Sequence, residues 1–72
     1  MKNLTIKQIL KYERLKRGFT QEEFAEFLGI KRSTLARYEA GSIPEPNKIK
    51  KLSSKLKIDL AIAIVNNDKT SL

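Results

Sequence analysis

Glycine and proline occur at only five positions in this chain of 72 residues, and their spacing limits what the chain can fold into. These residues divide the chain into pieces of helical length: Gly18, Gly29, Gly41, Pro44 and Pro46. Glycine commonly follows the end of a helix, and proline is favoured at the first helical position. The spacing therefore predicts an all-α fold of four to five short helices.

Capping signals mark the first two helices. Thr5 is an acceptable N-cap, and apolar residues recur after it at helical spacing as far as Gly18. Thr20 and Glu23 have the spacing of a capping box, which predicts that a second helix starts directly after Thr20. We expect Gly29 to end this helix in the left-handed backbone conformation that glycine tolerates.

Two more helices are expected after a short connection. The third fits Arg32–Ala40 and ends before Gly41. Glu45 and Pro46 have the positions of an N-cap and a first helical residue, which starts the fourth helix. Its apolar residues recur on one face and predict a buried stripe of Ile49, Leu52 and Leu56.

The last apolar segment, residues 58–65, fits two structures. Its large aliphatic side chains alternate with other residues, and this period of two favours a strand. The segment is rich in β-branched residues, and no good helix cap follows Lys57. The same residues also fit a helix, but we expect a short C-terminal β-strand. Residues 66–72 are polar and are expected to form a frayed tail.

Charge is distributed unevenly along the chain. The net charge is +7, from 15 Lys and Arg against 8 Asp and Glu. Residues 1–18 and residues 46–57 carry a net charge of +5 each, whereas residues 19–45 between them carry −2. If the two basic flanks fold together, they form a positive face that suits nucleic acid or an anionic membrane, although surface lysines also serve solubility.

The composition excludes several classes of protein. Cysteine and histidine are both absent, so the usual zinc sites and the Ser-His or Cys-His pairs of hydrolases cannot be built. We therefore expect no enzyme, no metal site and no cofactor. Residues 1–11 hold no unbroken apolar run, which predicts neither a signal peptide nor a membrane span and indicates a cytoplasmic protein.

Residues 18–41 predict two short helices joined by a tight turn. Their order is Gly-Phe-Thr-Gln-Glu-Glu-Phe-Ala-Glu-Phe-Leu-Gly-Ile-Lys-Arg-Ser-Thr-Leu-Ala-Arg-Tyr-Glu-Ala-Gly. Ala25 is small enough for the second helix to cross the third closely. From Leu10 to Leu56 the chain resembles the lambdoid repressor and Cro family, also called the Xre-type helix-turn-helix. This resemblance implies a third helix that lies in the major groove of DNA.

The free face of the third helix gives the expected base contacts. At 100° per residue, the face opposite the apolar Leu35 and Tyr38 spans about 140°. It holds Arg32, Ser33, Ala36 and Arg37. Arginine matches O6 and N7 of guanine, so the two arginines suggest operator half-sites that contain G.

Phosphate contacts are expected around this helix. They come from the start of the second helix, from Lys31 in place of a common Ser or Thr cap, and from the residue after Gly41. The set is Arg14, Thr20, Gln21, Lys31 and Ser42. The family resemblance also implies a structural ion pair between Arg14 and Glu39.

We expect a sequence-specific repressor of transcription that binds double-stranded DNA as a homodimer on a near-palindromic operator. Residues 1–57 would be the DNA-binding domain, and residues 58–65 the dimerisation segment, with contacts from Leu60, Ile62 and Ile64. This segment could instead only complete the core of a monomer.

An alternative function stays open. A helix followed by a short aliphatic strand is similar to the antitoxin branch of the family, whose members bind a HipA-type toxin and regulate their own operon. The resemblance implies a bacterial or phage protein at the nucleoid in either case.

Overall fold

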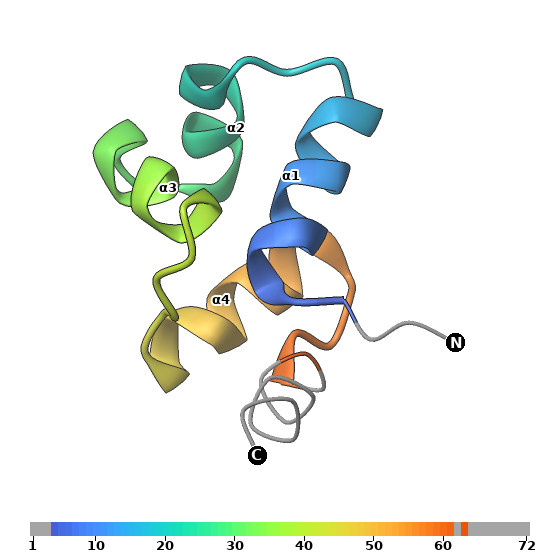
Figure 1. The fold of residues 1–72 in the computed structure, drawn as a ribbon, viewed down its shortest axis with the longest axis vertical. Coiled ribbons are helices and arrows are strands. Elements are labelled where there is room, and N and C mark those ends of the chain that lie inside the picture. Colours follow the sequence, from blue (N-terminus) through green and yellow to red (C-terminus); the bar gives the residue numbers. More distant parts are fainter. Residues whose placement is uncertain (1–3, 62, 64–72) are drawn as a thin grey trace.

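The computed structural model describes residues 4–61 and 63 and contains four helices in that part of the chain. They are α1 (Ile6–Lys16), α2 (Gln21–Leu28), α3 (Arg32–Glu39) and α4 (Pro46–Leu56). Figure 1 shows α2 and α3 together at one end of the molecule and α4 at the other, with α1 beside them. None of these helices is long and apolar enough to cross a membrane.

The expected N-caps of the first two helices are present. The Thr20 hydroxyl accepts a hydrogen bond from the Glu23 amide at 3.1 Å, and the Glu23 carboxylate accepts one from the Thr20 amide at 2.9 Å. Thr5 makes the same reciprocal pair with Gln8, a capping box that the sequence analysis did not identify. Gly29 has a φ of 78° and ends α2 in the left-handed conformation, as expected. Both helices are therefore defined by residues within their own first and last turns.

The other two helices begin without side-chain caps. Lys31 is the N-cap residue of α3, and Glu45 that of α4, and neither side chain bonds to the helix. Pro46 is in the first turn of α4, as expected, and its fixed φ favours helix initiation. Lys57 ends α4 in a left-handed conformation with a φ of 59°.

The core is one cluster of apolar side chains drawn from all four helices and from the segment after α4. α3 contacts both α1 and α2, and Ala25 is only 2% exposed. Phe19, Phe24 and Phe27 extend the core, with ring centroids 5.8 to 6.2 Å apart. The predicted stripe of α4 is buried, as are Ile6, Leu10, Phe24, Leu28, Leu35, Tyr38, Leu60 and Ala63.

The expected strand over residues 58–65 is not found in the part of that segment that the structure describes. Residues 58–60 form a bend and a turn, and Ala61 and Ala63 have helical backbone. The Leu60 amide donates to the Ser53 hydroxyl at 3.0 Å, and the Ala61 amide donates to the Asp59 carboxylate at 3.1 Å. Asp59 therefore makes a local side-chain bond of the kind found at turns and helix starts, which competes with a strand at this point.

Of the three expected dimer contacts, Leu60, Ile62 and Ile64, the structure describes only Leu60. Leu60 has no exposed surface and lies in the core of its own chain. Its burial matches the alternative in which the segment completes a monomer core. Ile62 and Ile64 lie outside the described residues, as does the expected tail over residues 66–72.

Candidate nucleic-acid interface

One side of α3 is open to solvent. Arg32, Ser33 and Arg37 are exposed on it, and Ala36 is half-buried between them. The opposite side carries Leu35 and Tyr38, which are 0% and 5% exposed. The structure therefore brings all four predicted base-contact residues onto one accessible face, where two long guanidinium groups flank two small side chains.

The N-terminus of α3 carries positive charge and no cap. Lys31 occupies the N-cap position without a side-chain hydrogen bond, and no acidic residue lies in the first turn. The first amides of a helix have no partner within the helix and form its positive end. The cations of Lys31 and Arg32 add to this positive end, which therefore favours binding of an anion such as a phosphate.

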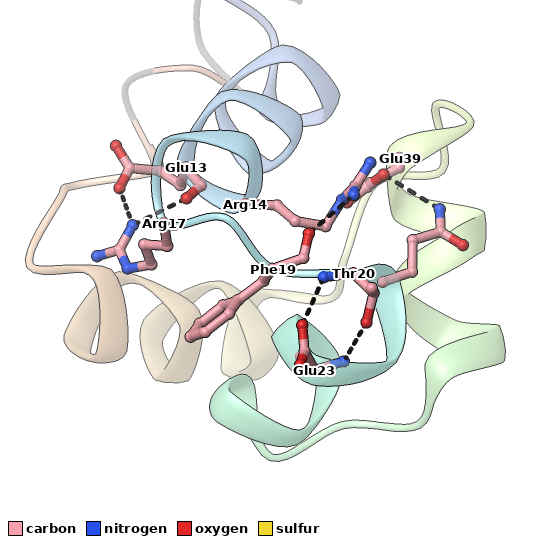
Figure 2. Close-up of polar contacts among 8 residues, drawn as sticks. Glu13, Arg14, Arg17, Phe19, Thr20, Glu23 and Glu39 are labelled. Carbon is pink, nitrogen blue, oxygen red and sulfur yellow. Dashed lines mark hydrogen bonds and ion pairs between the residues drawn. The ribbon is translucent and has the colours of Figure 1, made fainter.

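A partly buried polar network joins α1, α2 and α3 (Figure 2). The Nε of Arg14 lies 2.9 Å from Oε2 of Glu39, and its Nη1 donates to the Phe19 carbonyl at 3.2 Å. Gln21 donates from its side-chain amide to Oε1 of Glu39 at 3.2 Å. Glu39 thus receives bonds from two helices, and its own side chain is only 5% exposed.

This network occupies the side chains of two predicted phosphate contacts, Arg14 and Gln21. The family resemblance implied the Arg14–Glu39 pair, but no sequence pattern predicted the bond from Gln21 to Glu39. Since one amide hydrogen of Gln21 is used by Glu39, only the second remains for an outside group. The spacing of Gln21 and Glu39 across two helices gave no local signal for this contact.

Thr20 and Ser42 lie at the two ends of the helix pair, and both are exposed. The hydroxyl of Thr20 already accepts the capping bond from the Glu23 amide. The amides of Gly41 and Ser42 donate to the carbonyls of Tyr38 and Arg37 at 3.1 and 3.0 Å. The backbone after α3 therefore offers an outside anion the Ser42 hydroxyl rather than these amides.

Two open hollows run along the side of α3, and the sequence analysis did not predict either. Both are lined by Thr34 and by Lys48 from the first turn of α4. One continues over Lys31, and the other continues over Arg37 and Ser42. Lys48 therefore lies on one surface with three of the predicted contact residues, Lys31, Arg37 and Ser42. The five lysines of residues 46–57 were the available sequence signal, but they did not single out Lys48.

A second ionic cluster lies on α1, next to Arg14 in sequence. Glu13 is 4% exposed and pairs with Arg17 and, at 3.3 Å, with Lys16. Burial raises the pKa of the Glu13 carboxyl, but the hydrogen bonds and positive charges of Arg17 and Lys16 outweigh it, so the pKa lies below its ordinary value of 4.5. Arg17 also lies over the Phe27 ring, 5.4 Å from its centroid. This cluster fastens α1 to α2 and has no contact with the open face of α3.

Comparison with known proteins gives one match. Residues 10–62, more than half of the chain, match the sequence model of a family described as Helix-turn-helix. The matched segment contains all of α2, α3 and α4. No curated protein and no solved structure matches the chain significantly.

Proposed function

Because the chain belongs to the helix-turn-helix family, of the Xre/Cro type, and is thereby a DNA-binding regulator, we propose that it is a sequence-specific repressor. It binds double-stranded DNA with α3 in the major groove. The observation that carries this proposal is the open face of α3, where Arg32, Ser33, Ala36 and Arg37 lie together opposite the buried Leu35 and Tyr38. Arg32 and Arg37 read guanine, and the small residues between them allow close approach.

The surrounding groups position the helix on the phosphate backbone. Lys31 and Ser42 flank α3, and Thr20 and Gln21 lie at the N-terminus of α2, where unpaired amides and the helix dipole favour an anion. Arg14 positions Gln21 indirectly. Its guanidinium bonds to Glu39, and Glu39 in turn accepts a hydrogen bond from the side chain of Gln21. Phosphate contacts of this kind set the register of the protein without reading sequence.

Repression requires a stable register on the operator, and we propose that a homodimer supplies it. Two copies would contact half-sites about 34 Å apart, which is one turn of DNA. The dimer contacts proposed are Ile62 and Ile64, whereas Leu60 acts indirectly because it is already buried within its own chain. The expected result is a dimer by light scattering and a monomer for Ile64→Asp in the full chain. A wild-type monomer would remove the homodimer from the proposal.

The antitoxin alternative has less support. It was suggested by a C-terminal strand, and residues 58–61 and 63 are not in a strand. A HipA-type protein that co-purifies with the chain would restore this alternative.

The base-reading role of Arg37 can be tested by selection of binding sites from random duplexes. Arg37→Ala should lose discrimination at one operator position by about 1–3 kcal/mol and keep its salt-dependent binding to other DNA. Lys31→Ala is the matched control, because loss of a phosphate contact should weaken binding to all sequences alike. An equal loss of affinity on every sequence for Arg37→Ala would show that Arg37 contacts only phosphate.

A further inference from the structure

The outer face of α1 exposes apolar side chains that neither the core nor the DNA interface uses. Tyr12 is 59% exposed and Leu15 is 61% exposed. At 100° per residue, these two side chains lie at about 240° and 180° from Ile6, whose side chain is buried. Figure 1 shows α2 and α3 on one side of α1, and Arg14 faces Glu39 there. Tyr12 and Leu15 therefore face away from the neighbouring helices.

Lysines border this apolar pair on both sides. Lys11 lies beside Leu15 at about 140° around the helix, and Lys16 lies beside Tyr12 at about 280°. Both lysines are exposed, and the Nζ of Lys16 is 5.3 Å from the centroid of the Tyr12 ring. We call Lys11, Tyr12, Leu15 and Lys16 the outer patch of α1.

The charge of the outer patch is positive. Glu13 is the acidic residue of α1, and its carboxylate is buried and paired with Arg17 as well as Lys16. A second copy that docked on the outer patch through its own outer patch would bring lysines together, and like charges in contact are unfavourable. Phosphates of a duplex would match the lysines but would leave Tyr12 and Leu15 without apolar partners.

We propose that the outer patch of α1 docks an acidic amphipathic segment of another protein. Carboxylates of the partner pair with Lys11 and Lys16, and an aliphatic or aromatic side chain of the partner covers Tyr12 and Leu15. An amphipathic segment with anchors spaced by three or four residues fits the Tyr12 and Leu15 spacing. Because the outer patch is separate from the open face of α3, the partner and DNA can bind at the same time.

The test uses the full chain and two synthetic helical peptides as probes. The first peptide is rich in glutamate and carries leucines at spacings of three and four residues, and the second has serine in place of each leucine. Amide chemical shifts of the protein are followed as each peptide is added. The expected result is a set of shifts on the outer patch with the first peptide and affinity at least about tenfold lower for the second. Equal affinity for the two peptides, or shifts centred on α3, would overturn the proposal.

Variants separate this proposal from the DNA-binding function. The double variant with Tyr12→Ser and Leu15→Ser should lose about tenfold or more in affinity for the first peptide and keep its affinity for duplex DNA. Ile43→Ser is the matched control for peptide binding, because Ile43 is an exposed apolar residue of the α3–α4 connection, 52% exposed, and its loss should leave the affinity for the first peptide unchanged. Lys11→Glu is a second variant that leaves the apolar pair intact and should weaken peptide binding through charge alone.

Other occupants of the outer patch would give different results. Binding to vesicles of anionic lipid that depends on Tyr12 and Leu15, with no binding to the first peptide, would assign the patch to a membrane surface and overturn the proposal. Self-association that the double variant abolishes would assign it to a second copy and would also overturn it. Loss of duplex affinity in the double variant equal to its loss of peptide affinity would place the patch in the DNA interface instead.

Discussion

Helices α2 and α3 have the same length of eight residues and contact each other, but their N-termini are built differently. α2 has a capping box of Thr20 and Glu23 at its start and the left-handed Gly29 at its end. α3 starts at Lys31 without a side-chain cap, although Gly41 follows it with a positive φ of 125°, much as Gly29 ends α2. The N-terminus of the helix that supports the interface is therefore fixed by its own residues, and the N-terminus of the helix that forms the interface is not.

The difference indicates what holds α3 in place. Leu35 and Tyr38 bury its inner face, and Glu39 fixes its last turn to α1 and α2. An N-cap side chain on α3 would occupy an amide at the end that faces outward. Without such a cap, those amides stay free to bind a phosphate. The packing of Leu35 and Tyr38 then supplies the stability that a cap would have added to α3.

Removal of the buried anchor of α3 should have the largest effect on stability. Leu35→Ala leaves a cavity at a fully buried position and should lower the free energy of unfolding by about 2–5 kcal/mol. Denaturant titration followed by circular dichroism measures this change. Ile43→Ala, at an exposed residue, is the control. A loss below about 1 kcal/mol would mean that packing does not hold α3.

Removal of the polar anchor should have the next largest effect. Glu39→Ala leaves the side chains of Arg14 and Gln21 without their shared acceptor, and we expect a loss of about 1–3 kcal/mol and a lower melting temperature. DNA affinity should also fall, because Gln21 would lose its fixed position. Glu26→Ala removes an exposed carboxylate of α2 and is the matched control. If the two variants melt alike, the network does not contribute to stability.

The two N-caps can be compared directly by alanine substitution. Thr20→Ala removes a bonded cap and should lower stability by about 1 kcal/mol. Lys31→Ala removes a residue that makes no capping bond, so stability should stay within about 0.5 kcal/mol while DNA affinity falls. Thermal melts and a duplex titration of both variants give the two readings. Equal stability losses would contradict the difference between α2 and α3.

Loss of the Glu13 charge of α1 in acid should have the smallest effect on stability. The pKa of Glu13 is lowered in the folded chain, so its stabilising contribution is complete above its ordinary value of 4.5 and is lost as the pH falls through the folded value. Glu13→Gln should therefore reduce the slope of stability against pH between 4.5 and the lower folded pKa of Glu13. Duplex affinity at neutral pH should not change. A slope identical to that of the wild type would assign the acid sensitivity to other carboxylates.

The sequence by itself determined the helices. Thr5, Thr20, Gly29 and Pro46 act through bonds and backbone preferences that reach no further than about four residues, so their effects can be read from neighbouring residues. The open face of α3 followed from the same short-range periodicity, because Leu35 and Tyr38 define the opposite face. The period of two predicted the wrong structure for residues 58–61 and 63, because the local bond from the Ala61 amide to the Asp59 carboxylate favours a turn there.

Only the tertiary structure decided how these helices share their polar groups. The donation from Gln21 to Glu39, the burial of Glu13 and Leu60, and the position of Lys48 beside α3 join or bury residues through helices that are separate in the chain. Such contacts depend on the angles and distances at which the helices pack, and these are set by the core as a whole rather than by any local pattern of residues.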